Sequence, residues 1–241
     1  NGTVQGDITV QAGGGITANG TLVIGNTSSV LGLVMAPAAT LSVGAFGVTV
    51  NDSNTSGLGT VTIAGGSLTS LHGMQLASGS SIAGTGVVTG TVSMGGGSTM
   101  TATGASGLRF NNIVISTAGG LSGTIFGFNN GGGYNGQGTI AAKVDFDAGS
   151  TLFNGGALTM GDNTPAGVTF DGTMHVGTGT VTLLDSNGVG LGQLTELNGG
   201  TLACANQLVV NSIGPIQGHG DVQSPLLLIN TGGRIKPGDI A

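Results

Sequence analysis

Short alternations of apolar and polar residues recur along the chain at a nearly constant spacing. A phrase of Gly or Ala, then Thr or Ser, then apolar, polar and apolar residues begins at Gly20 (GTLVI), Ala39 (ATLSV) and Gly59 (GTVTI), and looser copies begin at Gly79 and Gly97. Because alternate residues of a strand point to opposite faces, each phrase predicts a short strand with one buried face.

A repeat of this length is typical of one coil of a β-solenoid. Residues 59–76 contain three such strands, TVTI, SLTSL and GMQLA, each set apart from the next by glycine. The alternation predicts that Thr60 and Thr62 face outward. It predicts that the following residues point inward: Val61, Ile63, Leu68, Val92, Val181, Leu183 and Leu202. Since crossovers between parallel strands are overwhelmingly right-handed, we expect a right-handed parallel β-helix with coils of about 18–20 residues, roughly 12–13 in all.

Composition favours the same all-β fold class. Hydrophobic residues make up 38% of the chain, 52 residues are Gly and aromatic residues reach only 3%, while helix-forming segments rich in Ala, Leu, Glu and Lys are missing. An antiparallel sandwich would predict strands every 8–12 residues and more aromatic core. We expect one solenoid domain over residues 1–241, with a Gly/Asn-rich loop insertion at 127–138. This loop holds Tyr134, either as a stacking residue for a ligand or as part of a flexible corner.

The charge of the chain excludes one class of partner. Its formal net charge is −6, and only four residues are Lys or Arg. Such a surface cannot make the several phosphate contacts that nucleic-acid binding requires. No apolar run has the length of a membrane-spanning helix, so we expect no membrane insertion. The single cysteine, Cys204, lies among Leu and Ala and is expected to be a small buried hydrophobe.

Two short motifs near the C-terminus bear on catalysis. Gly218–His219–Gly220 and Arg234–Ile235–Lys236 resemble two of the four signatures of polygalacturonases, right-handed β-helix enzymes that hydrolyse pectin. The resemblance implies a site with two or three cooperating carboxylates. That family carries them in an Asn-Thr-Asp motif and a double Asp, whereas this chain has Asn-Thr-Gly at 230–232 and no two adjacent acidic residues. We therefore expect no catalytic residues and no enzyme.

An internal repeat offers another interpretation of these motifs. Residues 81–104 align without gaps on residues 215–238, so that His219 takes the place of Thr85. The repeat, I-x-G-x-G-x-V followed by GG-x-I-x-PGD, resembles the Gly-rich coils of bacterial surface β-solenoids, including autotransporter passenger domains. The resemblance covers residues 81–104 and 196–241, and it implies an architecture rather than a ligand.

Metal-binding patterns are weak. Asp145 and Asp147 would share one face of a strand, but two carboxylates are too few for Ca²⁺ without further oxygen ligands, and an exposed pair beside Lys143 explains them. The three histidines, His72, His175 and His219, have no spacing typical of a zinc site. We expect no bound metal and no cofactor.

The low charge of the chain and terminal sequences that do not resemble caps indicate a structural role. A solenoid exposes an apolar coil at each end unless a polar cap covers it, and neither terminal sequence reads as a cap. The leading hypothesis is an extracellular or cell-surface structural protein whose copies stack end to end into a filament or surface layer, aided by Asp7 facing Arg234 or Lys236. The alternatives are an adhesin or autotransporter passenger stalk and a carbohydrate-active β-helix enzyme. Expected partners are copies of the chain, with a surface carbohydrate as an open candidate.

Overall fold

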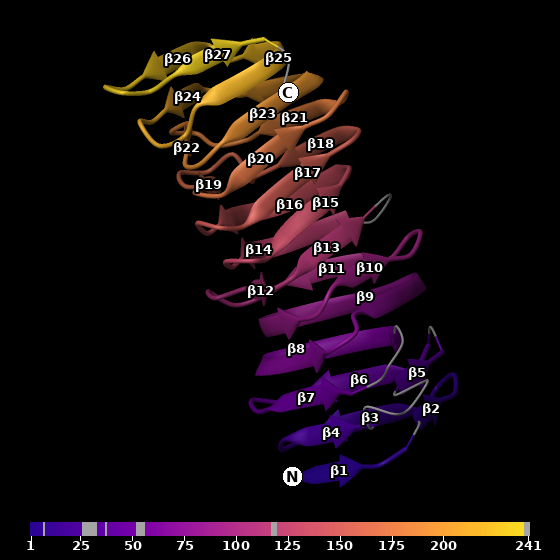
Figure 1. Ribbon diagram of the computed structural model, residues 1–241. Coiled ribbons are helices and arrows are strands. Elements are labelled where there is room, and N and C mark those ends of the chain that lie inside the picture. The colour runs from indigo at the N-terminus through magenta and orange to yellow at the C-terminus, as the bar shows by residue number, and fades with distance from the viewer. Residues whose placement is uncertain (7, 26–32, 37, 52–55, 117–119, 239–241) are drawn as a thin grey trace. The chain divides into compact units, whose positions relative to one another are not determined.

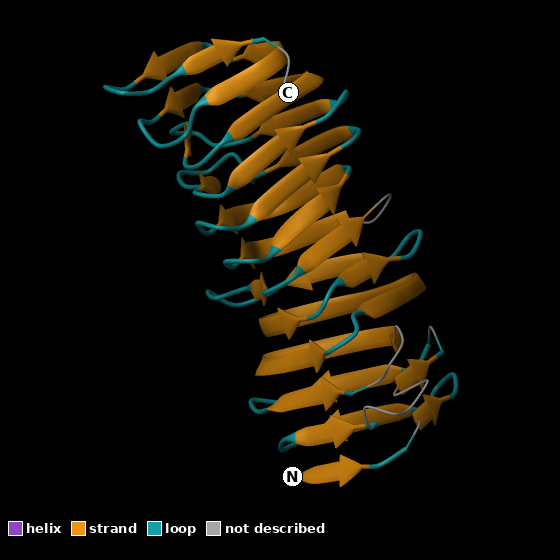
Figure 2. Cartoon of the chain, viewed as in Figure 1, coloured by secondary structure: helices purple, strands orange, loops and turns teal. Residues whose placement is uncertain are grey.

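Parallel strands make up the regular structure of this chain. The computed structural model describes residues 1–6, 8–25, 33–36, 38–51, 56–116 and 120–238. Among these residues there are strands and turns but no helix (Figure 2), and hence no helix that could cross a membrane. Each strand pairs in parallel with the strand one coil before or after it. The predicted parallel β-solenoid is confirmed; its right-handedness stays a prediction.

The chain divides into two compact units, residues 1–124 and 125–241, and Figure 1 labels strands of both. The strands of the first unit are β1 (Gly2–Val4), β2 (Ile8–Val10), β3 (Gly15–Ala18), β4 (Leu22–Ile24), β5 (Leu33–Met35), β6 (Thr40–Val43), β7 (Gly47–Val50), β8 (Ser56–Ser70), β9 (Met74–Thr89), β10 (Val92–Met94), β11 (Thr99–Ala102), β12 (Leu108–Phe110) and β13 (Ile113–Ser116). Strand β14 (Gly120–Phe128) begins in the first unit and ends in the second.

The second unit repeats the same organisation. Its strands are β15 (Gly133–Gly136), β16 (Gly138–Phe146), β17 (Thr151–Asn154), β18 (Ala157–Met160), β19 (Val168–Phe170), β20 (Thr173–Val176), β21 (Thr180–Leu183), β22 (Val189–Leu191), β23 (Thr195–Cys204), β24 (Gln207–Val210), β25 (Ile216–Gln223), β26 (Leu226–Ile229) and β27 (Ile235–Pro237). One face of this unit is formed by β15, β17, β20, the first half of β23, the first half of β25, and β27.

The coils are less regular in length than the sequence repeat predicts. The coil that leads from Ile82 to its register partner Met100 is short, whereas the coil that leads from Leu22 to its partner Val48 is considerably longer. The chain forms about 11 coils, fewer than the 12–13 expected, because several coils carry longer turns than the repeat allows for. The strands keep their register, since extra residues are absorbed at the corners.

Inward side chains stack into columns along each unit. In the first unit one column runs through five consecutive coils and consists of Leu41, Val61, Ile82, Met100 and Leu121, all buried. The seven residues predicted to point inward are all buried, and Thr60 and Thr62 are not, so this alternation is confirmed. Each added coil extends every column, which removes apolar surface from water at each step.

Aromatic residues form one column of the second unit. The Phe128 ring stacks on Phe146 with centroids 4.5 Å apart, and Phe146 packs on Phe170 at 4.8 Å. Tyr134 meets the edge of Phe128 at 6.2 Å, and its hydroxyl donates a hydrogen bond to the carbonyl oxygen of Gln137 (3.2 Å). Aromatic pairs of this kind add to the stability gained from buried area alone.

The predicted loop insertion at 127–138 is wrong in its central part. Residues Gly133–Gly136 form β15, which pairs with β17, and Tyr134 is fully buried in the core. Neither sequence interpretation of Tyr134, as a ligand-stacking residue or part of a flexible corner, describes it. Gly133 must lack a side chain here because a Cβ would overlap the carbonyl oxygen of Thr151 in the next coil. The glycine-rich segment is thus a strand in close contact with its neighbour.

The Gly-x-Gly pairs of the internal repeat turn the chain. Gly84 and Gly86 have φ angles of 129° and 144°, and their aligned partners Gly218 and Gly220 have φ angles of 101° and 150°. L-residues rarely adopt such angles. The residue between each pair, Thr85 or His219, is not buried. The structure therefore places Gly218–His219–Gly220 at a corner. Residues 84–86 form the equivalent corner in the other copy of the repeat.

Replacing Gly84 by Ala is expected to destabilise the fold by about 3 kcal/mol or more, because the new Cβ meets both an unfavourable φ and a backbone atom. The Cβ would overlap the carbonyl oxygen of Ile63. Gly96→Ala is the matched control, since its φ is permissive and nothing lies within 4 Å of the added atom. Thermal unfolding followed by circular dichroism measures both; equal melting temperatures for the two variants would contradict the corner argument.

The aromatic column makes a second stability prediction. Phe146→Ala removes the central ring of the column and leaves a cavity, which is expected to cost about 3–5 kcal/mol. Phe46→Ala, at a side chain that is 61% exposed, is expected to change stability by less than about 0.5 kcal/mol. Urea titrations of both variants give the free energies of unfolding. A Phe146 variant as stable as the Phe46 variant would show that the column contributes little.

Candidate functional site

One outward-facing row of side chains crosses six strands of the second unit. The register places these residues side by side, one on each of β15, β17, β20, β23, β25 and β27: Asn135, Phe153, His175, Glu196, Gln217 and Lys236. They alternate with inward residues, and we call this row the outer ladder. Neighbouring strands lie about 4.8 Å apart, so the side chains of adjacent rungs are in contact range.

Direct contacts fix the middle of the outer ladder. The Phe153 and His175 rings are stacked with centroids 4.6 Å apart and planes only 5° from parallel. The Nδ1 atom of His175 lies 2.7 Å from Oε2 of Glu196, and the Nε2 group of Gln217 donates to Oε1 of the same carboxylate at 2.9 Å. Both oxygens of Glu196 are therefore held. Once Nδ1–H donates to Glu196, Nε2 of a neutral His175 is free to accept a hydrogen bond.

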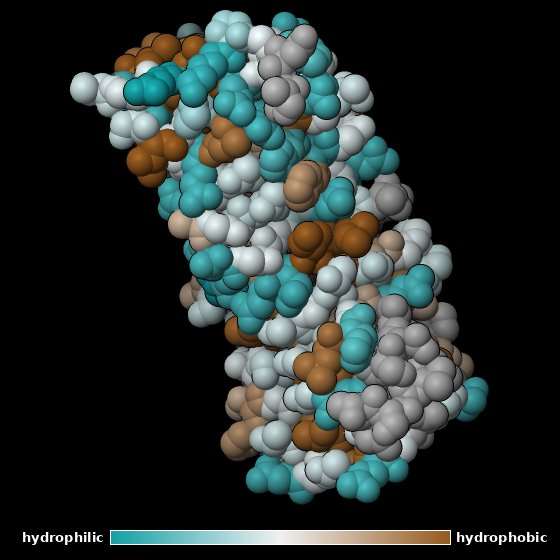
Figure 3. All heavy atoms as spheres, in the orientation of Figure 1, coloured by the Kyte–Doolittle hydropathy of each residue, from teal (hydrophilic) through white to brown (hydrophobic). Residues whose placement is uncertain are grey.

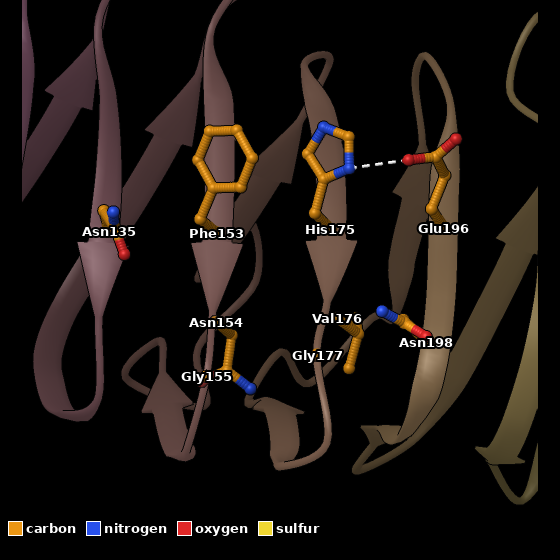
Figure 4. A pocket seen from close by; sticks show the side chains of 9 residues that line it. All are labelled: Asn135, Phe153, Asn154, Gly155, His175, Val176, Gly177, Glu196 and Asn198. Carbon is orange, nitrogen blue, oxygen red and sulfur yellow. Dashed lines mark ion pairs between the residues drawn. The ribbon is translucent and has the colours of Figure 1, made fainter. Parts of the chain in front are cut away.

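A hollow of about 510 Å³ lies beside these rings (Figure 4). Gly155 and Gly177 follow Phe153 and His175 by two positions each, so the corner beside the two rings carries no side chains. Asn198, at the equivalent position after Glu196, closes one end of the hollow. Figure 4 shows the Phe153 and His175 rings on neighbouring strands with their faces turned the same way. The hollow therefore forms because glycines, which have no side chains, occupy the corner next to the aromatic pair.

Asn154 lines the hollow and is bonded within the corner next to it. Its side chain is 4% exposed, and its Oδ1 accepts a hydrogen bond from the backbone N–H of Gly156 at 3.0 Å. Its Nδ2 group has no hydrogen-bond partner among the described residues, and it is buried. A buried donor without a partner costs about 1–3 kcal/mol, so this corner is strained in hydrogen bonding.

The lining of the hollow is suited to binding more than to hydrolysis. A His–carboxylate pair can transfer protons, but a hydrolase also needs a nucleophile or a second carboxylate. The nine lining residues contain Glu196 as their single carboxylate and include no Ser, Thr or Cys. What they offer is a stacked aromatic pair, Phe153 and His175, surrounded by amide and carboxylate groups.

One residue of each polygalacturonase-like motif, His219 and Lys236, lies on the same face as the hollow. His219 pairs in register with Asn198, and Lys236 pairs with Gln217, so both are on or beside the outer ladder. Asp221 lies past the corner, in register with Thr201. The structure thus places His219 and Lys236 on neighbouring rungs, but among the described residues it gathers no set of carboxylates around them.

Sequence motifs miss the residues that make the hollow. They consider His175 only in a search for zinc spacing, which the three histidines lack, and they do not single out Phe153 or Glu196. A usable signal exists in the chain, because Phe153, His175, Glu196 and Gln217 follow one another at nearly equal intervals. Recognising it requires the phase of the coils, which the irregular turns hide.

The remaining residues considered in the sequence analysis are the cysteine, two aspartates and the other histidines, and their positions in the fold are as follows. Cys204 is buried, as predicted, and its Sγ donates to the carbonyl oxygen of Gln207 at 3.1 Å. Asp145 lies on β16 and Asp147 directly follows it. In the described part of the chain no three His, Cys, Asp or Glu side chains are grouped closely enough to hold a metal ion. His72 belongs to the first unit, whereas His175 and His219 belong to the second.

No protein-family model, curated protein sequence or solved structure shows a significant match to this chain.

The position of His219 leads to a prediction about pectin. We expect that the protein releases no reducing ends from polygalacturonate, and that His219→Ala and Asp221→Asn leave its stability and assembly nearly unchanged, because the part of the chain that the structure describes places no set of carboxylates around these residues. A reducing-sugar assay beside a commercial pectinase as positive control measures this. Hydrolysis that disappears in the His219 variant would restore the enzyme hypothesis.

Proposed function

We propose that this chain is an extracellular structural protein, a β-solenoid subunit that stacks end to end with copies of itself into a filament or a surface layer. The observation that carries the proposal is the apolar rung formed by the second half of β25, by β26 and by β27. The resemblance of residues 81–104 and 196–241 to coils of bacterial surface solenoids supports the extracellular, cell-surface setting. The low charge of the chain, 6% of residues, suits a subunit whose neighbours cover part of its surface.

The last rung leaves its core columns open. Leu227 and Ile229 are in register with Leu208 and Val210, which are fully buried, yet Leu227 is 37% exposed and Ile229 is 53% exposed. Ile235 is likewise exposed although its partner Ile216 is buried. Figure 3 shows apolar surface gathered over β26. A further rung of strands, stacked on this one, would bury these side chains.

The first rung is open in the same way. Val4 is in register with Ile24, Ile8 with Leu33, and Ile16 with Leu41. The second-rung residues are completely buried, whereas none of the first-rung residues is. A rung with open columns also presents strand edges whose backbone N–H and C=O groups can pair with another strand.

A second copy of the chain offers a matching surface to each of these two rungs. The open rung of the second unit offers apolar columns and a parallel strand edge, and the open rung of the first unit offers the same features. Contact between two different surfaces of identical subunits does not close on itself, so it generates a fibre. Asp7, the acidic residue expected to face Arg234 or Lys236, lies outside the described residues and contributes nothing to this argument.

The experiment places charge into the open columns. Leu227→Lys combined with Ile229→Lys is expected to leave a soluble solenoid that sediments as a monomer at concentrations where the unmodified chain forms filaments, because buried lysines in the contact would be unpaired. Ile213→Lys with Leu226→Lys is the matched control: it adds the same charge at exposed positions that do not stack on core residues. Analytical ultracentrifugation and electron microscopy of negatively stained samples give the readout.

Two results would overturn the proposal. If the unmodified chain stays monomeric at high concentration, no end-to-end stacking occurs, and the passenger-stalk alternative becomes the better hypothesis. If the column variant forms the same filaments as the control, the contact does not use this rung. A variant of the first rung, Ile8→Lys with Val10→Lys, tests the other side of the same contact.

A further inference from the structure

We propose that the hollow beside Phe153 and His175 binds a neutral oligosaccharide made of pyranose rings. The site lies on the side of the second unit, away from its open columns, so the inference does not depend on self-assembly. Four features of the described residues support it: an exposed phenylalanine ring stacked on a histidine, polar groups held in place around it, spacing along the solenoid, and charge.

The aromatic pair matches the apolar face of a sugar. Phe153 is 39% exposed, and its ring is stacked on that of His175, so the pair offers a ligand the outer face of Phe153 and the edges of both rings. A pyranose ring directs several C–H bonds to one of its faces, and the electron-rich face of an aromatic ring attracts them. Side chains of Val or Leu would bury the same area without offering a plane.

The surrounding polar groups match the rim of a sugar ring. Hydroxyl groups both donate and accept hydrogen bonds, and the amides of Asn135 and Asn198 can do the same. The Glu196 carboxylate adds acceptors, and His175 Nε2 can accept a further hydrogen bond. Glu196 is already oriented by His175 and Gln217, so a ligand finds it in place. Groups fixed before binding lose little conformational entropy when a ligand arrives.

The spacing of the solenoid matches an extended chain of sugars. Successive rungs of the outer ladder are about 4.8 Å apart, which is close to the length that one ring adds to an extended pyranose chain. An oligosaccharide lying across the strands would therefore meet an equivalent position at each rung, from Asn135 to Gln217. This geometry favours a linear chain of several rings over a single sugar.

Charge favours a neutral ligand. When His175 is neutral, Glu196 is the charged residue in the lining of the hollow, and its charge is negative. The chain as a whole has a net charge of −6. Both repel a polyanion. Lys236 lies farther along the same face, two rungs beyond Glu196, and an acidic oligosaccharide would have to bind there instead.

The first test is direct binding. Isothermal titration of the unmodified protein with cellohexaose, xylohexaose, mannohexaose and laminarihexaose is expected to give saturable binding for at least one of them. Hexagalacturonate provides the acidic comparison. If none of the four neutral hexasaccharides binds, or if only hexagalacturonate binds, the proposal is wrong.

Variants then locate the site. Phe153→Ala is expected to weaken binding at least tenfold, whereas Phe153→Trp, which keeps a flat ring, is expected to retain it. Gly155→Leu fills the hollow without strain, because nothing lies within 4 Å of a Cβ there, and it is also expected to weaken binding at least tenfold. Phe46→Ala, an exposed phenylalanine of the first unit, is the matched control and should bind as the unmodified chain does.

Thermal unfolding of each variant separates binding from stability. Phe153→Leu keeps an apolar side chain at this position but not the plane, so loss of binding with an unchanged melting temperature identifies ring stacking as the cause. Unchanged affinity in both Phe153→Ala and Gly155→Leu would place any observed binding elsewhere and overturn the assignment.

Discussion

The fold depends on parallel backbone pairing between successive coils. This pairing fixes the rise from one coil to the next at the strand spacing, so residues at matching positions are held in direct contact. An inward position is stable only if its column is apolar throughout, as in the column from Leu41 to Leu121. The same constraint brings backbone so close at the corners that Gly66, Gly84 and Gly133 have no room for a Cβ.

The constraint acts on the outer surface as well. Outward residues at matching positions also stack, and there they can be polar, provided that neighbouring side chains suit one another. The second unit uses this in the sequence Phe153, His175, Glu196 and Gln217, where ring stacking passes into hydrogen bonding along one row. Asn230 and Asn211 form a shorter amide pair of the same kind, with Nδ2 of the former 2.9 Å from Oδ1 of the latter.

The sequence pattern predicts the strands of this chain and their buried positions better than it predicts which residues come together on its surface. The alternation around Val61 and Val181 identifies strands and their buried faces because period-two patterning is local. Residues 127–138 mislead because Gly and Asn are typical of loops, yet in a solenoid Gly133 is required by the contact with Thr151 of the next coil. The hollow escapes sequence reasoning for a related reason: corners of different length shift the phase, so Phe153 and Glu196 become neighbours of His175 only when the coils are known.

Stacking between copies and ligand binding would use different surfaces of the second unit. The open columns at Leu227 and Ile229 continue along the stack of coils, while the outer ladder points away from it. A contact that covers the open rung therefore leaves Phe153 and His175, which lie several coils earlier, exposed on the side. If copies assemble through their rungs, each added copy contributes another hollow, and weak affinity for an oligosaccharide at one hollow becomes strong avidity when one long glycan meets many. An assembly built for mechanical continuity would in this way gain a surface for carbohydrate attachment without any change in the fold.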